Sequence, residues 1–352
     1  MKIVHLLPAL EQGGVESVVC DLARLLVREG HEVLVVSAGG RLVARIEQAG
    51  ARHRTLDLKS KNPLTYFPRA NRLRRILRDE KPDLVCTHSR VPAWLFVWAN
   101  RALGLKWITY AHGANSVSRY SAVMTRGDLV VTPSRFLADY LKQHYGTPER
   151  KIRVVPNPVD TARFDPDNLD RAFVAEMRRA WGVRPGDQVR MAIGRITPVK
   201  GLEGLIREFA SRVAADPQGC AREKLVIVGG ADRRHLGHLA ALQSLAASLF
   251  PPPSPVVFAG AQEKVPECIS IADEIVSANT TKPETFGLSV AEAYAMNKPV
   301  AVQRRFGGVA EVMAAVEGAG CASRRAAVLK LYGTDVFIAR TMSVYREALD
   351  MV

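Results

Sequence analysis

Short apolar runs rich in branched residues alternate with helical patterns along this sequence of 352 residues, and this alternation constrains the fold most. In the first half the runs lie at residues 3–7, 33–37, 84–87, 107–111, 129–132 and 152–155. In the second half they lie at residues 191–193, 225–228, 256–258, 274–277 and 299–302. Apolar strands that alternate with helices predict parallel sheets covered by helices on both faces. The expected fold class is therefore α/β.

A stretch dense in proline and turn residues divides the chain. It follows the predicted strand at 152–155 and reads VVPNPVDTARFDPDN over residues 154–168. The length of 352 residues also exceeds that of one ordinary domain, about 100 to 200 residues. We predict a first domain over residues 1–165 and a second over 166–334. A final helix over residues 335–352 is expected to pack toward the first domain.

The chain is strongly basic, with 49 Lys and Arg against 35 Asp and Glu and a formal net charge of +14. This excess favours partners that carry phosphate, such as nucleotides, anionic membranes or nucleic acid. Residues 41–78 hold eleven of the cations against two acidic residues, and Leu73, Ile76 and Leu77 form an apolar stripe there. We expect this region to contact an anionic membrane surface, with a merely solvated basic face as the alternative.

Two compositional features bear on location. No signal-peptide pattern precedes the first predicted strand, and the longest uncharged apolar stretch, residues 91–100, is too short to span a bilayer. We therefore expect a cytoplasmic protein. The five cysteines are scattered and contain no CxxC pair, which predicts buried thiols rather than a zinc or redox site. Trp94, Phe96 and Trp98 are expected to pack in the interior.

Residues 282–301, KPETFGLSVAEAYAMNKPVA, combine an acidic loop residue with a helix start. Pro283 disfavours helical geometry in the preceding residue, so we expect the helix to begin near Phe286. Glu284 would then lie in the entering loop and Glu292 about two turns further on, so both carboxylates could address one elongated ligand. Free N–H groups at the helix start favour a phosphate. The alternative is a capping glutamate followed by a solvated one.

The turn GRITPVKG, residues 194–201, follows a predicted strand and carries two cations. Glycine and proline hold Arg195 and Lys200 on this loop, an arrangement suited to clamping a diphosphate. Ordinary exposed surface cations are the alternative.

Three residues of the first half also follow predicted strands, namely Gly13, Gly14 and His112. Parallel sheets bind ligands beyond the carboxyl ends of their strands, so these residues are candidates for lining one crevice. The full GxGxxG pattern does not occur in the sequence, which disfavours a nicotinamide or flavin enzyme.

Taken together, these motifs resemble glycosyltransferase family 4. The resemblance rests on the Gly13-Gly14 turn, NPVD at 157–160, GRITPVKG, the Glu284 and Glu292 pair, and GG-x-x-E at 307–311. It implies the GT-B fold, in which two Rossmann-like domains face each other and bind the sugar donor mainly by the second and the acceptor by the first. It also implies an enzyme that retains the anomeric configuration and needs no cofactor or obligatory metal.

The resemblance assigns roles to individual residues. Arg195 and Lys200 would hold the donor diphosphate and offset the charge that grows on the leaving phosphate. Glu284 would contact the sugar, and Glu292 the ribose hydroxyls. His112 would lie near the attacked carbon, with a structural histidine as the alternative. The other residues expected at the nucleotide sugar are Gly13, Gly14, Gly230, Val265, Phe286, Gly287, Leu288 and Ser289.

The chain departs from the family pattern in two places. Residues 229–232 read Gly-Gly-Ala-Asp instead of the more common glycine and acid turn, and few residues separate Glu311 from the last helix. The expected donor is a nucleotide diphosphate sugar, with a UDP-sugar favoured, and the expected acceptor a cell-envelope glycan or glycolipid such as lipopolysaccharide core. One alternative is a module that binds a nucleotide sugar without turnover. Another alternative is a nucleic-acid binder, suggested only by the net charge of +14, but the chain lacks the interleaved aromatic and basic residues expected of one.

Overall fold

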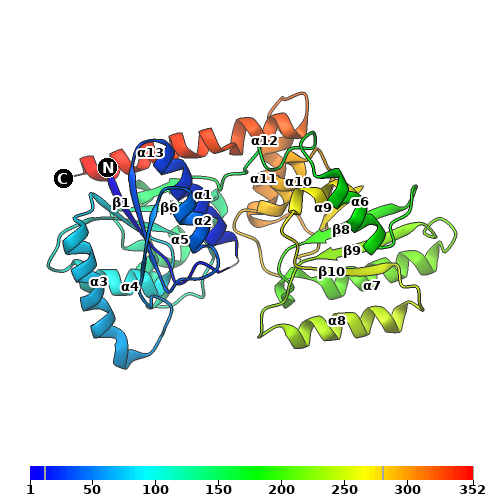
Figure 1. The fold of residues 1–352 in the computed structure, drawn as a ribbon, viewed down its shortest axis with the longest axis horizontal. Coiled ribbons are helices and arrows are strands. Elements are labelled where there is room, and N and C mark those ends of the chain that lie inside the picture. The colour runs from blue at the N-terminus through cyan, green and yellow to red at the C-terminus, as the bar shows by residue number, and fades with distance from the viewer. Residues whose placement is uncertain (12, 280, 352) are drawn as a thin grey trace. The chain divides into compact units, whose positions relative to one another are not determined.

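The computed structural model describes residues 1–11, 13–279 and 281–351, and the chain forms two compact units (Figure 1). Unit 1 comprises Met1–Pro158 and Thr334–Val352, and unit 2 comprises Val159–Gly333. The proline-rich stretch at 154–168 therefore spans the junction, whereas the sequence-based boundary lay after residue 165.

Unit 1 contains a seven-stranded parallel sheet in the order β3-β2-β1-β4-β5-β6-β7. Its strands are β1 (Lys2–Leu6), β2 (Glu32–Ser37), β3 (Arg52–Thr55), β4 (Leu84–Thr87), β5 (Lys106–Tyr110), β6 (Leu129–Thr132) and β7 (Ile152–Val154). Its helices are α1 (Gly14–Arg28), α2 (Val43–Gln48), α3 (Tyr66–Glu80), α4 (Arg90–Asn100), α5 (Arg135–Tyr145) and α13 (Thr334–Asp350). Short 3-10 turns are η1 (Pro63–Thr65), η2 (Ser121–Thr125) and η3 (Glu149–Lys151).

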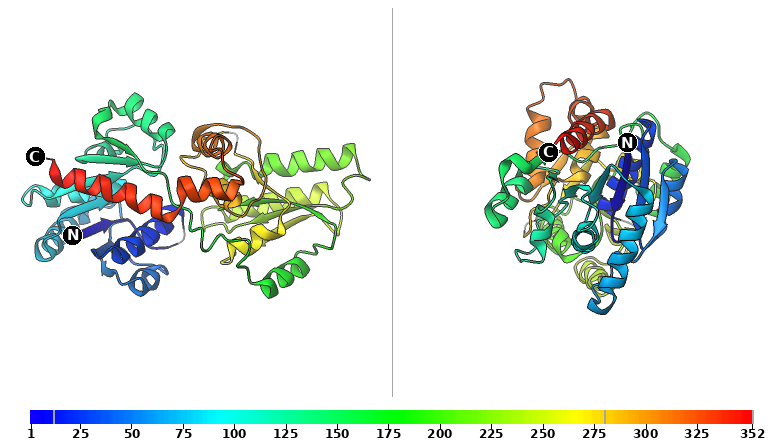
Figure 2. Two further views of the ribbon diagram at one scale, coloured as in Figure 1. Left: turned by 90° about the horizontal axis from the view of Figure 1, so that it is seen from above. Right: turned by 90° about the vertical axis from the view of Figure 1, so that its left-hand side faces the viewer.

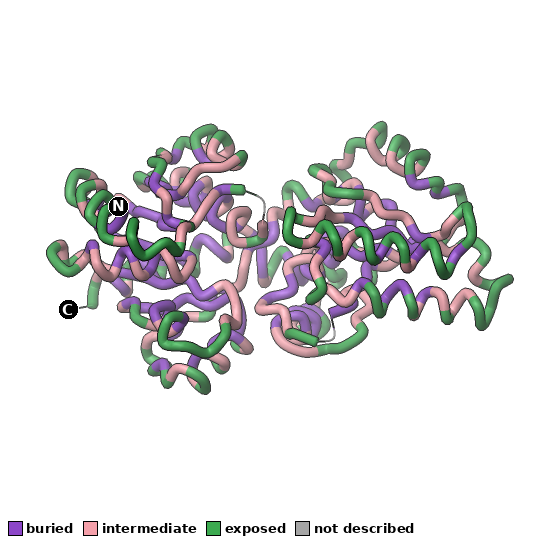
Figure 3. Tube along the Cα trace, turned by 90° about the horizontal axis from the view of Figure 1, so that it is seen from below, coloured by how far each residue is buried: buried purple, intermediate pink, exposed green. Residues whose placement is uncertain are grey.

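Alternate residues of each strand are buried on opposite faces of this sheet. In β1, Ile3 packs with α1 and α13, whereas Val4 packs with α3 and α4. This period of two is that of a strand covered on both faces. Figure 3 shows that the buried parts of the trace lie in the interior of the unit and the exposed parts at its surface. The predicted strands of this half are all present. The sequence analysis missed β3, because Arg52–Thr55 is a polar edge strand that pairs only with β2.

The C-terminal helix α13 packs on unit 1, as expected (Figure 2). Tyr345 on this helix is fully buried, and its hydroxyl oxygen accepts a hydrogen bond from the Tyr110 hydroxyl at 2.9 Å. The Cys86 thiol contacts the same hydroxyl at 3.5 Å. The helix is thus part of the core of unit 1.

Unit 2 contains a five-stranded parallel sheet in the order β10-β9-β8-β11-β12. Its strands are β8 (Gln188–Ile193), β9 (Glu223–Val228), β10 (Val256–Gly260), β11 (Glu274–Ser277) and β12 (Val300–Val302). Its helices are α6 (Arg171–Ala180), α7 (Leu202–Ala215), α8 (Leu236–Leu249), α9 (Val265–Ile271), α10 (Leu288–Ala295), α11 (Gly307–Glu317) and α12 (Arg324–Tyr332), with the 3-10 turn η4 (Pro198–Lys200). Strand order changes direction at β8, which places a switch point between β8 and β11.

None of the helices in the described part of the chain combines the length and the apolar composition that crossing a bilayer requires.

Candidate functional site

A pocket that is open to solvent lies in unit 2 where β8 and β11 end. Loops diverge at the switch point of a parallel sheet, and this is where such sheets bind ligands. The pocket is lined by Ala192, Ile193, Gly194, Arg195, Lys200, Leu202, Ile227, Val276, Ser277, Ala278, Asn279, Glu284 and Ser289. Four of the residues predicted from the sequence therefore line one pocket, namely Arg195, Lys200, Glu284 and Ser289.

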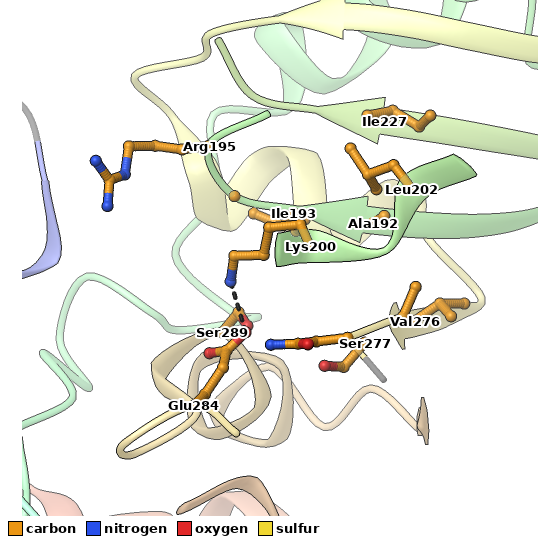
Figure 4. Close-up of a pocket in the computed structure, with 13 residues that line it drawn as sticks. Ala192, Ile193, Arg195, Lys200, Leu202, Ile227, Val276, Ser277, Glu284 and Ser289 are labelled. Carbon is orange, nitrogen blue, oxygen red and sulfur yellow. Dashed lines mark hydrogen bonds and ion pairs between the residues drawn. The ribbon is translucent and has the colours of Figure 1, made fainter. Parts of the chain in front are cut away.

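Lys200 and Glu284 form an ion pair in this pocket (Figure 4). Lys200 Nζ donates to Glu284 Oε1 at 2.6 Å, although the two residues are 84 positions apart in the sequence. The side chains retain 29% and 20% exposure. A partly exposed pair of this kind contributes about 0–1 kcal/mol to stability, so a phosphate can replace the carboxylate at little cost.

Glycines hold Lys200 in place. Gly201 has φ 67°, and a Cβ there would lie 2.1 Å from the carbonyl oxygen of Ala278. Gly194 has φ 139°, and a Cβ there would lie 3.4 Å from Lys200 Cε. The GRITPVKG loop thus needs glycine at both ends. Gly201 allows close contact with the end of β11, and Gly194 allows the backbone conformation of the loop.

A second pair of glycines supports the loop that carries Glu284. The backbone N–H of Gly308 donates to the Glu284 carbonyl at 2.7 Å. A Cβ on Gly308 would lie 2.4 Å from the nitrogen of Phe286, and Gly307 has φ 61°. The GG-x-x-E motif therefore has a structural reason in this chain, because only glycine lets α11 approach the Glu284 loop this closely.

Helix α10 begins at Leu288, two residues later than expected. Gly287 precedes it with φ 88°, and a Cβ there would lie 2.8 Å from Val309 Cγ2. The Phe286 side chain is buried and meets the Tyr332 ring edge-on, so it packs in the core. Only the main chain of Phe286 can therefore serve a ligand.

Arg195 is exposed and points away from the Lys200–Glu284 pair in Figure 4. It makes no ion pair with any residue in the described ranges, which leaves its guanidinium available for an anion.

The sequence analysis missed two polar residues of the pocket, Ser277 and Asn279. Asn279 is buried and closes its own loop, since its Nδ2 donates to the Lys282 carbonyl at 2.5 Å. Both residues lie at or just beyond the end of β11, and that position was the signal that could have identified them.

Six predicted residues of unit 2 do not line this pocket, namely Gly230, Val265, Phe286, Gly287, Leu288 and Glu292. Glu292 is half-buried on α10. The Gly230 carbonyl accepts a hydrogen bond from the nitrogen of Ile196 at 2.9 Å, so it borders the Arg195 loop. Val265 begins α9, and its side chain packs against the core of unit 2. Their roles in nucleotide binding stay predictions.

The remaining predicted residues belong to unit 1. Gly14 is the first residue of α1, and the space where its Cβ would lie is empty. Gly13 precedes it in extended conformation. His112 follows β5, and its Nε2 lies 2.9 Å from Nδ1 of His88. Burial lowers the pKa of His112 to about 4, so the ring is neutral near pH 7.

Both halves of the chain match families of known proteins. Residues 12–163 match the model for Glycosyltransferase Family 4, and residues 187–330 match the model for Glycosyl transferases group 1. The D-inositol 3-phosphate glycosyltransferase of Rhodococcus opacus is 31% identical over 185 residues. That alignment covers 51% of this chain and only 38% of the relative.

Solved structures share the complete fold. A glycosyltransferase from Rickettsia africae ESF-5 has a TM-score of 0.85 and 24% identity, over 100% of this chain and 99% of that chain. Anabaena Alr3699/HepE in complex with UDP-glucose has a TM-score of 0.79 and 19% identity, over 98% and 100%. WaaG, a glycosyltransferase involved in lipopolysaccharide biosynthesis, has a TM-score of 0.67 and 16% identity, over 99% of this chain and 95% of that chain. The chain thus has the GT-B fold, and its first and second halves are similar in turn to Glycosyltransferase Family 4 and to Glycosyl transferases group 1.

Proposed function

We propose that this protein transfers a sugar from a nucleotide diphosphate sugar to an acceptor, and that the pocket of unit 2 binds the donor. The observation that carries the proposal is the exchangeable Lys200–Glu284 pair at the switch point. A cation, a carboxylate and the start of a helix in one pocket match the diphosphate and the hydroxyls of such a donor. A UDP-sugar is the favoured donor, in line with the UDP-glucose complex of the Anabaena protein.

In the proposed reaction, the diphosphate draws Lys200 away from Glu284. Lys200 and Arg195 then offset the negative charge that grows on the leaving phosphate, so the chain's own cations supply the electrostatic stabilisation. The released Glu284 carboxylate accepts hydrogen bonds from sugar hydroxyls. The bond between the anomeric carbon and the phosphate oxygen breaks, and the acceptor oxygen bonds on the same face. The acceptor's proton passes to the leaving phosphate, and the anomeric configuration is retained.

A panel of UDP-, GDP- and ADP-sugars tests this proposal. We expect one UDP-sugar to be transferred, with Lys200→Ala and Glu284→Ala strongly impaired and the product retaining the donor's anomeric configuration by NMR. Tight nucleotide-sugar binding without transfer to any acceptor would favour the alternative of a binding module. If no nucleotide sugar is bound, hydrolysed or transferred and both variants behave like the unmodified protein, the proposal is wrong.

For the acceptor we propose a cell-envelope glycan or glycolipid such as lipopolysaccharide core, presented at the cytoplasmic face of the membrane. The likeness to WaaG supports this choice only through the fold. The name of the Rhodococcus relatives suggests a different chemistry, a small phosphorylated cyclitol. Transfer assays with a lipid-linked core oligosaccharide and with D-inositol 3-phosphate distinguish the two acceptor classes.

The position predicted for the contact with an anionic membrane has to be corrected. The apolar stripe of α3 is not available for lipid, because Leu73 and Leu77 are buried in the core of unit 1. Several cations of residues 41–78 are also engaged within the protein. Arg52 pairs with Glu80, and Arg69 is buried and donates to main-chain carbonyls. The apolar side of α3 therefore faces the core of unit 1, and its exposed side is the basic one.

We propose instead that the start of α3 contacts the membrane. Leu64 is 86% exposed and Phe67 53% exposed. Phe67 meets the Trp98 ring edge-on with centroids 4.8 Å apart, and the Arg101 guanidinium lies over the Trp98 ring at 4.7 Å from its centroid. Residues 58–78 contain seven Lys or Arg and no Asp or Glu. Exposed apolar and aromatic side chains in a region rich in cations match the interface of an anionic bilayer.

Vesicle binding tests this surface. The double variant Leu64→Ser, Phe67→Ser should lose most of the binding to vesicles that contain anionic phosphatidylglycerol. Leu236→Ser is the matched control, because Leu236 is 54% exposed on unit 2, outside the basic region. Equal binding of the double variant and the control would contradict the proposed contact.

A further inference from the structure

Three histidines of unit 1 form one continuous hydrogen-bonded chain. His5 Nδ1 lies 2.9 Å from His88 Nε2, and His88 Nδ1 lies 2.9 Å from His112 Nε2. His5 belongs to β1, His88 follows β4, and His112 follows β5. These strands are neighbours in the sheet, and its order changes direction between β1 and β4. The chain therefore runs to the ligand-binding edge of unit 1.

The protein interior keeps this chain neutral. His5 and His88 are buried, and burial lowers the pKa of His5 to about 3 and that of His88 well below its ordinary value. Tyr110 stacks on His88 with ring centroids 4.7 Å apart. Beyond it lie Cys86 and Tyr345, and burial raises the pKa of all three groups, that of Cys86 to about 12. No ion pair joins a carboxylate to His5 or His88 among the described residues.

The His5 end of the histidine chain determines the direction in which its hydrogen bonds donate. His5 Nε2 is buried and has no hydrogen-bond partner in the described part of the protein. A proton on that nitrogen would create an orphaned buried N–H donor, and such donors are rare in native structures. A proton on His5 Nδ1 instead donates to His88 Nε2, which forces the His88 proton onto Nδ1 and makes His112 Nε2 the acceptor.

We propose that His5 and His88 are positioning residues that hold His112 as its Nδ1–H tautomer. All three rings then carry their proton on Nδ1, and the donors point from His5 toward His112. Resting on the proposed function, this assigns His112 the role of a neutral hydrogen-bond donor to a substrate oxygen. It does not act as the base, which agrees with the leaving phosphate taking the acceptor's proton.

Nitrogen NMR of the full protein labelled with ¹⁵N-histidine tests the tautomers without any need for turnover. We expect Nδ1–H and bare Nε2 signals for His5, His88 and His112 near pH 7. His88→Phe should release His112 from this single tautomer. His88→Asn is the matched control, because its amide nitrogen can replace the Nδ1–H donor. A bare Nδ1 on His112 in the unmodified protein would overturn the proposal.

Kinetics supply the second readout. His88→Phe should lower kcat roughly tenfold to a hundredfold with an unchanged donor KM, whereas His88→Asn should recover most of the rate. Equal rates for the two variants would overturn the inference while leaving the transferase proposal intact. An unmodified protein without transfer activity would instead refute the proposed function, and the tautomers would still be measurable.

His5→Phe covers the case in which His88→Phe does not fold. This variant removes the first donor of the chain but keeps an aromatic ring in the same buried space. We expect His88 and His112 to show mixed tautomers in its nitrogen spectrum. A His112 signal identical to that of the unmodified protein would show that the chain does not transmit the tautomer.

Discussion

The two sheets bring very different polar groups to equivalent positions. At the switch point of unit 1 a chain of neutral imidazoles is buried, whereas at that of unit 2 a charged Lys200–Glu284 pair is partly exposed. Burial penalises charge, so the first arrangement is rigid and uncharged. Partial exposure makes an ion pair weak, so the second can open for an anion. In the proposed reaction, unit 1 would therefore orient a hydrogen-bond donor, and unit 2 would neutralise the charge of the diphosphate.

The origin of the side chains also differs. His5 comes from within β1, and its register beside Cys86 of β4 is set by the sheet. Lys200 and Glu284 come from loops, and close contacts at Gly201 and Gly308 hold these loops. One site therefore depends on strand pairing and the other on glycine contacts.

We expect the largest loss of activity when the cation of Lys200 in unit 2 is removed. Lys200→Ala removes the charge nearest the proposed diphosphate and should lower kcat/KM for the nucleotide sugar about a hundredfold to a thousandfold. Arg207→Ala is the control, since Arg207 pairs with Glu203 on the exposed face of α7. Steady-state transfer assays compare the two variants, and a loss below tenfold for Lys200→Ala would break the assignment of charge to this pocket.

We expect somewhat smaller effects from substitutions of Glu284 and Glu292, and we expect the two effects to differ in kind. Glu284→Ala should lower kcat about a hundredfold, while nucleotide affinity holds or rises because Lys200 loses its competing partner. Glu292→Ala should mainly weaken nucleotide binding, as its predicted ribose contact requires. Calorimetry with UDP and turnover assays measure both quantities. Comparable losses confined to affinity in both variants would contradict this division of roles.

The glycine contacts of unit 2 make a prediction about stability. Gly201→Ala places a Cβ at φ 67° and 2.1 Å from a carbonyl oxygen, so it should lower the free energy of unfolding by about 2–3 kcal/mol. Gly204→Ala lies nearby on α7 with nothing within 4 Å of its Cβ, and it should raise stability by about 0.4–1 kcal/mol. Urea unfolding measures both. Similar stabilities would show that the loop adapts to a side chain.

The last effect concerns the acid stability of unit 1. The folded pKa of His5 is about 3 and its unfolded value about 6.5, so unfolding takes up a proton between these values. Its stability contribution is complete above about pH 6.5 and is lost as the pH falls toward the folded pKa, by about 1.4 kcal/mol per pH unit. His5→Phe should flatten this dependence.

Tryptophan fluorescence measures the acid effect on unit 1. Trp94, Trp98 and Trp107 lie in unit 1, and Trp181 lies in unit 2. A Trp181→Phe background therefore reports on unit 1 alone during urea unfolding at pH 7, 6 and 5. An unchanged pH slope in His5→Phe would show that the buried imidazole does not contribute.

The strands and the donor loops were largely predictable because their signals are local. Branched apolar runs fitted a sheet covered on both faces, and glycine with proline marked the loop that carries Lys200. The polar edge strand β3 escaped because its pairing with β2 leaves no periodic apolar pattern. The stripe of α3 was identified as apolar, but periodicity does not say whether lipid or the protein's own core covers it.

The sequence by itself determined two α/β units, the residues at the ends of their strands and the resemblance to glycosyltransferase family 4. Only the tertiary structure decided which of these residues meet. The Lys200–Glu284 pair joins positions 84 apart, and the histidine chain joins three strands through imidazoles with no motif in common. Burial and hydrogen-bond direction are properties of that assembled environment, because the same imidazole is a titrating base in water and a neutral donor inside the sheet.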